Sequence, residues 1–324
     1  MKKVKRLISI VIPAYNEEEG LDELYRRLQK VLDGLDKYSF EVIIVENGSR
    51  DDTYKKLLEI HQKDKRFKIV QLSKNFNCDG GISAGLKYVR GDAVILMNAD
   101  LQDPPEIIPE FINKWEQGYE IIYGVIQKRK GVSILRKMVS WMFYQTIYSL
   151  TNGQIKKNVS DFRLIDKKVY EVINSMPEHN RFLRGMISWT GFKSTGIPFV
   201  RAERYKEGGE AKVLSIFQRA KNIKWFVTNA IFTFSDFPLK LMTSVGAFTS
   251  FLSFILAMYF LGGYLIYGTA SPGYVKGHTS LMLVILFLFG VLFIFLGIIG
   301  KYISKIYDEV KQRPLYIVRD KIGV

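Results

Sequence analysis

The sequence predicts an α/β fold with a mostly parallel sheet, followed by helices that lie on and cross a membrane. Short apolar runs of strand length recur about every 25 to 30 residues, with helical patterns between them, as in βαβ units. Polar residues follow several of these runs, and two long apolar segments without charge stand near the C-terminus. The 324 residues are enough for one sizeable domain and these additional helices.

Local patterns predict the strands and helices of the first half of the chain. Residues 7–12 form a short run rich in isoleucine and valine, which is typical of a buried strand. Asn16 then suits a helix N-cap, and apolar residues at helical spacing predict the helix itself: Leu21, Leu24, Leu28, Val31, Leu32 and Leu35. Four further strands are predicted at 40–45, 67–72, 93–97 and 120–125. A short helix that carries Leu57 and a helix at 82–89 lie between them.

The chain turns abruptly polar where the strand at 93–97 ends. Asn98, Asp100, Gln102 and Asp103 gather there, before two prolines that stop the strand. Ligands of open α/β sheets bind beyond the carboxyl ends of strands, and a carboxylate with amide neighbours suits a divalent cation that holds a diphosphate. We therefore predict that Asp100 and Gln102 are ligands and that Asp103 caps the next helix. A solvated turn is the alternative, but capping one helix does not require three further polar groups.

Polar residues also follow the first and second strands, which would place three polar loops on one edge of the sheet. A dinucleotide-binding oxidoreductase is the competing prediction for such a fold, and it would have Gly-x-Gly-x-x-Gly after the first strand. The chain instead has Pro-Ala-Tyr-Asn-Glu-Glu-Glu at 13–19, whose carboxylates would repel a pyrophosphate. The sequence therefore excludes that class.

A basic stretch follows the fifth strand, with Lys128, Arg129, Lys130, Arg136 and Lys137. A solvated loop is the usual interpretation of such a run. However, Arg136 and Ser140 lie one helical turn apart on a segment rich in aromatic residues. We expect an amphipathic helix that shelters a lipid tail while Arg136 and Ser140 hold its phosphate.

Two later motifs carry charged residues. Asp161 precedes Phe162 and Arg163, and two interpretations of it are level: a functional acid that the arginine orients, or a structural ion pair with Arg163. Arg201, Arg204 and Lys212 bracket a glycine-rich charged segment, which is typical of a mobile lid over a diphosphate.

The apolar runs at 241–267 and 279–300 are each long enough to cross the roughly 30 Å hydrocarbon core of a bilayer. A buried core helix is the alternative, but such helices seldom run this long without one charge. Basic residues flank both runs on one side, whereas the connecting loop carries only Lys276, so we expect cytoplasmic termini and an external loop. Residues 213–227 and 229–239 are typical of interfacial amphipathic helices.

The formal charge is +15, for which nucleic-acid binding is the first interpretation. Because many basic residues lie near the apolar runs and no nucleic-acid motif is present, anionic lipids and a phosphorylated substrate are favoured. Cys78 is the only cysteine, which excludes disulfides within the chain and a multi-cysteine metal site. The N-terminus runs into a strand rather than a signal-peptide core, so we expect the first 240 residues in the cytoplasm.

Several motifs together resemble family 2 glycosyltransferases that act on polyprenyl phosphates. The sequence Asn-Ala-Asp-Leu-Gln-Asp-Pro-Pro-Glu at 98–106 is similar to the family's Asp-x-Asp-Leu-Gln-Asp-Pro-Pro-Glu, with Asn98 in place of the first aspartate. Glu-Asn-Gly-Ser at 46–49 occupies the position of Asp-Asp-Gly-Ser, and residues 160–164 resemble Gly-Asp-Phe-Arg-Leu. Residues 201–212 resemble the family's Arg-x-x-Arg…Gly-Glu-Ser-Lys loop. The resemblance covers nearly the whole chain and is strongest to bactoprenol (undecaprenyl phosphate) glucosyltransferases, which are related to dolichyl-phosphate mannose synthases.

The resemblance implies a GT-A catalytic domain at 1–212, interfacial helices at 213–240, membrane spans at 241–267 and 279–303 around an external loop at 268–278, and a basic cytoplasmic tail at 304–324. It implies roles for individual residues as follows: nucleotide-sugar binding by Pro13, Tyr15, Glu17, Glu46, Asn98, Ala99, Gln102 and Lys212; catalysis by Asp100, Asp161 and Arg204; acceptor-phosphate contact by Arg136, Ser140 and Arg201. The cofactor would be Mg²⁺ or Mn²⁺ on Asp100, Gln102 and Asn98.

The implied reaction moves a sugar from a nucleotide diphosphate sugar, first of all UDP-glucose, to polyprenyl phosphate, with inversion. It would take place at the cytoplasmic face of the inner (cytoplasmic) membrane. The implied partners are undecaprenyl phosphate, membrane lipids and further copies of the chain, up to a tetramer, but no nucleic acid. Alternative donors are GDP-mannose and a UDP-N-acetylhexosamine. A catalytically weak lipid-phosphate-binding homologue, indicated by Asn98 and Asn47, remains an alternative. A flippase or channel is disfavoured because the spans carry no buried charge.

Overall fold

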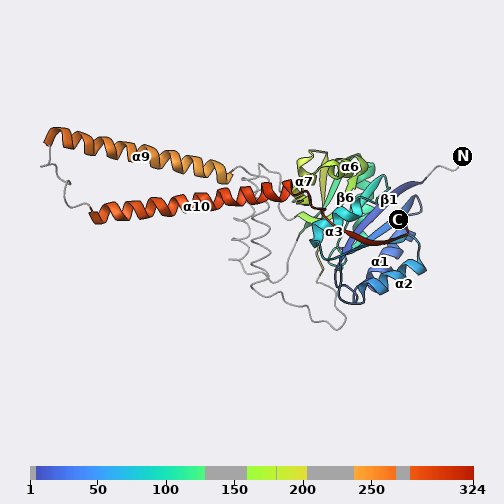
Figure 1. Cartoon of the computed structure of the whole chain (residues 1–324). Coiled ribbons are helices and arrows are strands. Elements are labelled where there is room, and N and C mark those ends of the chain that lie inside the picture. The colour runs from blue at the N-terminus through green and yellow to red at the C-terminus, as the bar shows by residue number, and fades with distance from the viewer. Residues whose placement is uncertain (1–4, 128–158, 180, 203–236, 268–277) are drawn as a thin grey trace. The chain divides into compact units, whose positions relative to one another are not determined.

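The computed structural model describes residues 5–127, 159–179, 181–202, 237–267 and 278–324 (Figure 1). The chain divides into two units. One contains Met1–Trp225 together with Gln312–Val324, and the other contains Phe226–Lys311. The C-terminal residues therefore belong to the same unit as the N-terminal sheet.

An eight-stranded sheet forms the first unit, in the order β7-β5-β6-β4-β1-β2-β3-β8. β1 (Arg6–Ala14) lies between β2 (Tyr38–Glu46) and β4 (Ala93–Leu96), and β3 (Phe67–Leu72) follows β2, all in parallel. β6 (Val159–Asp166) is antiparallel to both β4 and β5 (Ile121–Ile126), and β7 (Ser194–Phe199) is parallel to β5. The predicted α/β fold with a mostly parallel sheet is confirmed.

Helices cover the two faces of this sheet (Figure 1). On one face, α1 (Leu21–Asp33) contacts α2 (Thr53–Lys63) and the short helix η1 (Pro105–Ile107), which continues into α4 (Ile108–Glu116). On the other, α6 (Lys167–Ser175) contacts both α3 (Asn77–Leu86) and α7 (Leu183–Trp189). This two-sided arrangement follows from parallel strands, whose connections must cross over a face of the sheet.

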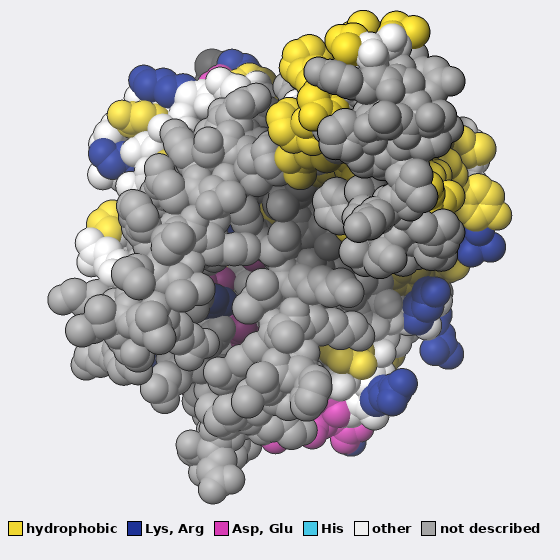
Figure 2. Space-filling view, turned by 90° about the vertical axis from the view of Figure 1, so that its left-hand side faces the viewer, with side chains coloured by type: hydrophobic (Ala, Val, Ile, Leu, Met, Phe, Trp, Pro, Cys, Tyr) yellow, Lys and Arg dark blue, Asp and Glu magenta, His cyan; other side chains and the backbone are white. Residues whose placement is uncertain are grey.

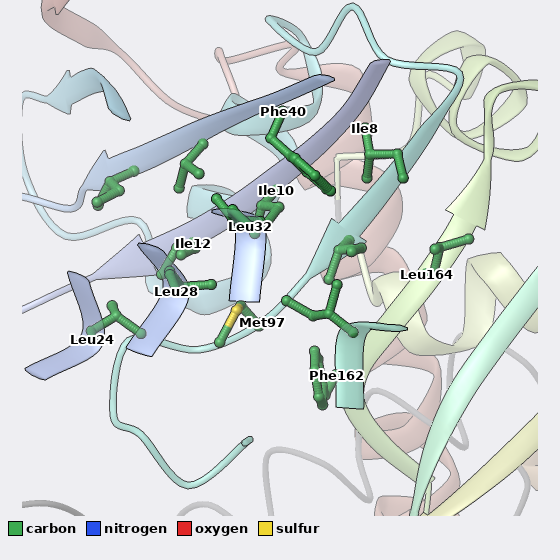
Figure 3. Close-up of a cluster of buried hydrophobic side chains, with 14 of the residues drawn as sticks. Ile8, Ile10, Ile12, Leu24, Leu28, Leu32, Phe40, Met97, Phe162 and Leu164 are labelled. Carbon is green, nitrogen blue, oxygen red and sulfur yellow. The ribbon is translucent and has the colours of Figure 1, made fainter. Parts of the chain in front are cut away.

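The core between β1 and α1 explains why these two elements form. Alternate residues of β1 point to the same face, so Ile8, Ile10 and Ile12 all face the helical layer, where Leu24 and Leu28 meet them (Figure 3). All five are at most 1% exposed. Burying a leucine or isoleucine side chain stabilises a fold by about 1.5–3 kcal/mol. On the opposite face, Gly85 of α3 lies so close to Val11 of β1 that an added Cβ would stand 2.4 Å from a valine methyl group.

Two helices begin at other residues than the sequence predicted. Asn16 is not an N-cap, because α1 begins at Leu21 after Gly20, and Asn16 instead has a positive φ of 52°. α3 begins at Asn77, five residues before the predicted start at 82. In both places the chain after a strand has polar contacts to a neighbouring loop, which outweigh the local capping pattern.

The last strand, β8 (Val318–Ile322), pairs antiparallel with β3 and completes the edge of the sheet. The backbone N–H of Ser73 donates to the Ile317 carbonyl at 2.9 Å, and Ile322 packs against the core. The sequence predicted only a basic tail here. Pairing covers the β3 edge, which would otherwise present unpaired backbone groups.

The second unit contains two long helices, α9 (Phe237–Tyr267) and α10 (His278–Val310). Most exposed large hydrophobic side chains of the described residues belong to these helices; hydrophobic side chains are yellow in Figure 2. Within the described residues, one segment, Leu288–Val310, is long and apolar enough to cross a membrane. Two spans and the external loop therefore stay predictions, and the interfacial helix at 213–227 lies outside the described residues.

Candidate functional site

Three polar loops meet at the carboxyl edge of the parallel strands. They follow β1, β2 and β4, which are neighbours in the sheet and run in the same direction. The carboxyl ends of such strands form the usual ligand-binding edge of an α/β sheet. The sequence prediction that these loops share one edge is confirmed by this strand order.

The loops after β1 and β2, residues 15–18 and 46–53, are joined by hydrogen bonds and are called here the paired loops. The Asn16 side-chain oxygen accepts from the Arg50 N–H at 2.9 Å, and the Asn16 N–H donates to Ser49 Oγ at 3.1 Å. The Glu17 N–H donates to Thr53 Oγ1 at 3.0 Å. Glu46 is buried, and its Oε1 accepts from the Ser49 N–H at 2.5 Å. These contacts hold both loops in one conformation.

Asn47 connects the paired loops to the start of α3. Its side-chain oxygen accepts from the Phe76 N–H, and its side-chain NH₂ donates to the Asn77 carbonyl, both at 2.9 Å. An aspartate could replace the first bond but not the second, because a carboxylate has no N–H. Next to it, Gly48 has a φ of +70°, and an added Cβ would lie 2.5 Å from the Lys74 carbonyl carbon. Asn47 thus has a structural role, as the hydrogen-bond partner of two backbone groups.

The turn after β4 has a strained backbone. Leu101 is 2% exposed yet has a φ of 58°, a conformation that bulky residues rarely adopt. Asp100 Oδ1 accepts from the Gln102 N–H at 3.2 Å. The Ala202 N–H donates to the Gln102 carbonyl at 3.2 Å, which brings Arg201 beside this turn. Strain that the surrounding structure maintains is common at functional sites.

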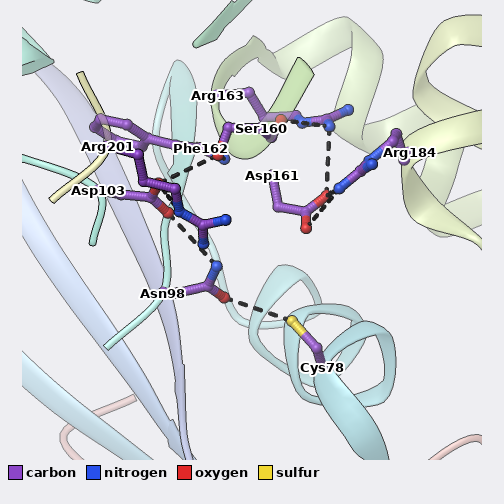
Figure 4. Close-up of polar contacts among 9 residues, drawn as sticks. All are labelled: Cys78, Asn98, Asp103, Ser160, Asp161, Phe162, Arg163, Arg184 and Arg201. Carbon is purple, nitrogen blue, oxygen red and sulfur yellow. Dashed lines mark hydrogen bonds and ion pairs between the residues drawn. The ribbon is translucent and has the colours of Figure 1, made fainter. Parts of the chain in front are cut away.

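Asp103 does not cap a helix, contrary to the sequence prediction. The N-cap of η1 is Pro104, without a side-chain hydrogen bond, and Asp103 itself is 0% exposed. It accepts from Ser160 Oγ at 3.2 Å and from Asn98 Nδ2 at 3.5 Å, and Arg201 Nε lies 4.0 Å from its Oδ1 (Figure 4). Burial raises the pKa of Asp103 to about 6, although the positive charge of Arg201 opposes this shift.

Asp161 is held chiefly by Arg184, from α7. The guanidinium Nη2 of Arg184 donates to both carboxylate oxygens at 2.9 Å, and its Nε donates to Oδ1 at 3.1 Å. Arg163 lies further away, with Nη2 at 3.6 Å from Oδ1 (Figure 4). Burial by itself would raise the pKa of Asp161, but Arg184 and Arg163 outweigh it and lower that pKa. The predicted pair with Arg163 therefore exists, but Arg184 is the main partner.

Asp79 belongs to the same electrostatic environment. Burial, and then the negative charge of Asp161, raise the pKa of Asp79 to about 7. Burial also lowers the pKa of Arg163 to about 10. The group formed by Asp79, Asp103, Asp161, Arg163, Arg184 and Arg201 is called the charged cluster below. Acids with raised pKa values beside arginines are typical of functional sites.

Comparison with known proteins identifies the family. The model of glycosyl transferase family 2 matches residues 9–173, which is about half of the chain. The chain belongs to glycosyl transferase family 2. An uncharacterized glycosyltransferase of Synechocystis sp. is 41% identical over 98% of this chain and 96% of its own length. The prophage-derived bactoprenol glucosyl transferase of Shigella flexneri is 34% identical over 96% of this chain and 97% of its own. The Bacillus subtilis glycosyltransferase YkcC is 41% identical over 98% of this chain and 94% of its own.

The residues predicted for this family 2 glycosyltransferase fall into two groups. Pro13, Tyr15, Glu17 and Glu46 lie in or next to the paired loops, and Asn98, Ala99, Asp100 and Gln102 lie in the turn after β4. Arg201 and Asp161 come from the second half of the sheet and lie near Asn98 (Figure 4). Arg136, Ser140, Arg204 and Lys212 lie outside the described residues.

The oxygens near Asp100 fit a divalent cation that is shared with a substrate. Among the described residues, no group of three or more His, Cys, Asp or Glu side chains could enclose a metal. Mg²⁺ sites commonly use only one or two carboxylates and take their other ligands from phosphate oxygens and water. Asp100 with the amide oxygens of Asn98 and Gln102 matches that pattern. The donor set therefore suits Mg²⁺ or Mn²⁺ bound together with a diphosphate.

Three residues of this glycosyltransferase site were not predicted from the sequence: Arg184, Ser160 and Asp79. Arg184 lies 23 residues from Asp161 in the chain, and Ser160 lies 57 residues from Asp103. Asp79 lies in the segment Asn-Phe-Asn-Cys-Asp-Gly-Gly at 75–81, for which the sequence leaves two interpretations open: a helix entry with flexible glycines, or direct contact with a ligand. The available signals were an arginine after Phe182 and Leu183 and a serine where the family motif has glycine. Neither signal indicates which carboxylate the residue contacts.

Proposed function

We propose that this glycosyltransferase transfers a sugar from a nucleotide diphosphate sugar, first of all UDP-glucose, to the phosphate of a polyprenyl lipid. The donor and acceptor are supported by the similarity to bactoprenol glucosyl transferases, which extends over nearly the whole of both chains. GDP-mannose and a UDP-N-acetylhexosamine are the other donors to compare. The reaction is assigned to the cytoplasmic face of the membrane, with α9 and α10 as the anchor; a homo-oligomer, up to a tetramer, stays a prediction.

The observation that carries this proposal is the position of Arg201. Its neighbour Ala202 is hydrogen-bonded to Gln102, so the arginine is fixed beside the proposed diphosphate site. Its side chain is 26% exposed, and within the described part of the chain no close ion pair occupies the guanidinium group, because Asp103 lies 4.0 Å from the buried Nε. A partly exposed guanidinium group without a close ion pair is suited to bind phosphate. Arg201 can therefore receive a second anion, the acceptor phosphate, next to the donor.

The chemistry requires positioning more than a base. An acceptor phosphate with a second pKa near 6 is already largely ionised at neutral pH. Its oxygen attacks the anomeric carbon as the bond from that carbon to the diphosphate oxygen breaks, and the nucleoside diphosphate leaves with the electron pair. Attack from the opposite face inverts the anomeric centre. The barrier therefore lies in alignment and in the charge of the leaving group.

Each part of the site has a role in this reaction. The paired loops position the nucleotide, with Glu46 Oε2 assigned to the base ring, since Oε1 already accepts from Ser49. Asp161 is held by two arginines, so we assign it to orienting Arg184 rather than to removing a proton. Asp100, Asn98 and Gln102 would hold Mg²⁺ or Mn²⁺, which supplies positive charge for the departing diphosphate.

A turnover assay with the full-length protein tests the proposal. Membranes that contain the chain are incubated with undecaprenyl phosphate, Mn²⁺ and one radiolabelled donor at a time: UDP-glucose, UDP-N-acetylglucosamine or GDP-mannose. We expect label in a lipid fraction that releases sugar under mild acid, with UDP-glucose as the best donor. A different preferred donor would change the assigned sugar. Absence of lipid product with every donor would overturn the proposal.

A further inference from the structure

Asp103 is a fully buried carboxylate that the proposed reaction does not use. It is 0% exposed and neither caps η1 nor forms a close ion pair, since Arg201 Nε lies 4.0 Å from its Oδ1. A charge buried in this way is costly unless hydrogen-bond donors surround it. The contacts of Asp103 therefore indicate why it is there.

Each oxygen of Asp103 has a different donor. Ser160 Oγ donates to Oδ1 at 3.2 Å, and Asn98 Nδ2 donates to Oδ2 at 3.5 Å (Figure 4). The role of Ser160 as a donor is fixed by a second bond, because its Oγ accepts the Phe162 N–H at 3.2 Å. With that lone pair occupied, the hydroxyl hydrogen is directed to Asp103. Ser160 thus holds Asp103 with Oδ2 toward Asn98.

These contacts distinguish the NH₂ group of the Asn98 carboxamide from its oxygen. Its NH₂ group faces Asp103, and its oxygen accepts from the Cys78 thiol at 3.6 Å (Figure 4). A flipped carboxamide would bring its oxygen against the Asp103 carboxylate. The Asn98 oxygen therefore points away from Asp103 and toward Cys78.

Asn98 and Ser160 both donate a hydrogen bond to the same carboxylate. An aspartate has two equivalent oxygens and needs no orientation to offer one to a metal, whereas an asparagine does. An asparagine at a ligand position therefore benefits from neighbours that orient it.

We propose that Asp103 and Ser160 are positioning residues that orient the Asn98 carboxamide, so that its oxygen is a preset ligand for the metal–diphosphate group. The inference rests on the proposed function, because it assumes that Asn98 and Asp100 face the donor diphosphate. It adds that Ser160 acts on metal binding through Asn98. The contribution of Ser160 to metal affinity should then depend on which residue stands at position 98.

A double-mutant comparison in the full-length protein tests this dependence. The variants are Ser160→Ala, Asn98→Asp and the combination, and Ser175→Ala is the matched control, because its hydroxyl donates only to the Val172 carbonyl on α6. The probe is Mn²⁺ in the presence of saturating UDP, followed by the loss of the free-ion electron paramagnetic resonance signal, with GDP in parallel. Loss of an outer-shell partner of a metal site typically weakens metal affinity 10–100-fold.

We expect Ser160→Ala to weaken Mn²⁺ affinity about tenfold when Asn98 is present. In the Asn98→Asp background the same change should have an effect of less than about threefold, because either carboxylate oxygen can face the metal. Equal losses in the two backgrounds, or no loss beside Asn98, would overturn the inference. In a turnover assay, Ser160→Ala should raise the Mn²⁺ concentration that gives half-maximal rate, while kcat at saturating Mn²⁺ falls less than about threefold. If kcat falls by the same factor as the apparent Mn²⁺ affinity, Ser160 has a merely structural role.

A second pair of variants addresses Asp103 directly. Asp103→Asn keeps an oxygen that can accept from Asn98, so it should retain more Mn²⁺ affinity than Asp103→Leu, which keeps none. Equal affinities of the two would contradict the inference, and if Asp103→Leu does not fold, the Ser160 comparison decides alone. Mn²⁺–UDP binding requires no lipid acceptor. A positive binding result without sugar transfer would therefore overturn the proposed function and leave the positioning role intact.

Discussion

The paired loops and the charged cluster lie on the same edge of one sheet, but they are stabilised in different ways. The paired loops are joined by hydrogen bonds from backbone N–H groups to neutral and carboxylate side chains, such as the bonds from the Arg50 N–H to Asn16 and from the Asp52 N–H to Glu18. The charged cluster instead contains Asp79 and Asp103, whose pKa values are raised to about 7 and about 6, chiefly by burial. Hydrogen bonds fix the conformation of the paired loops, whereas the charged cluster keeps carboxylates in an environment that disfavours their charged form.

This difference changes the meaning of two similar substitutions. Asn47 and Asn98 both stand where the family motif has aspartate. In the paired loops, Asn47 uses both ends of its amide for backbone contacts to Phe76 and Asn77, which is a structural role. In the charged cluster, the amide of Asn98 lies between a buried carboxylate and a thiol. We therefore expect the same replacement to affect folding in one region and ligand binding in the other.

The largest expected effect comes from Asp100. Asp100→Asn removes the only carboxylate in the Asn98–Asp100 pair and should reduce sugar transfer about 100-fold or more, because charge stabilisation of a leaving group is commonly worth that much. The thermal unfolding midpoint should change little, since Asp100 is only partly buried. Transfer rates over a range of Mn²⁺ concentrations measure the effect. Near-normal turnover at low Mn²⁺ would show that the metal site lies elsewhere.

A change in the paired loops should act on stability instead. Asn47→Asp removes the donor to the Asn77 carbonyl and leaves two oxygens facing each other, which should lower the free energy of unfolding by about 1–3 kcal/mol. Asn113→Asp is the matched control, because Asn113 is exposed and its side-chain oxygen only accepts, from Gln117. Chemical denaturation of both variants measures the difference. Equal stability of the two would contradict the structural role of Asn47.

The smallest expected effect is a gain of stability in the charged cluster. The folded pKa of Asp79, about 7, lies above its unfolded value near 4, so the folded state binds the extra proton and becomes less stable as pH rises through this window. Asp79→Asn should therefore stabilise the protein at pH 8, by on the order of 1 kcal/mol. The gain should shrink as pH falls from 7 toward 4.

Thermal unfolding at pH 8 and pH 5 measures this dependence, with the exposed Asp36→Asn as the control. A gain that is the same at both pH values would show that Asp79 is not held in an unfavourable environment. If Asp79→Asn also lowers sugar transfer, the charge contributes to function at a cost in stability, as in many functional sites.

The first half of the fold could be predicted from the sequence because its signals are local. The strands at residues 7–12, 40–45, 67–72 and 93–97 match β1 to β4 closely, since apolar runs bounded by polar residues indicate buried strands directly. Helix starts were less predictable. Asn16 has the pattern of an N-cap, but its contacts to Ser49 and Arg50 come from another loop.

The α/β class, the polar loops at the carboxyl ends of β1, β2 and β4, and the family motifs could all be predicted from residues that are close together in the chain. Three further features became known from the folded chain: β8 pairs with β3, Arg184 holds Asp161, and Asp103 is buried between Ser160 and Asn98. The two groups of features differ in the range of the interactions that produce them. Periodicity and turn chemistry act between near neighbours, whereas strand pairing and the burial of a carboxylate depend on residues that folding brings together from distant parts of the chain.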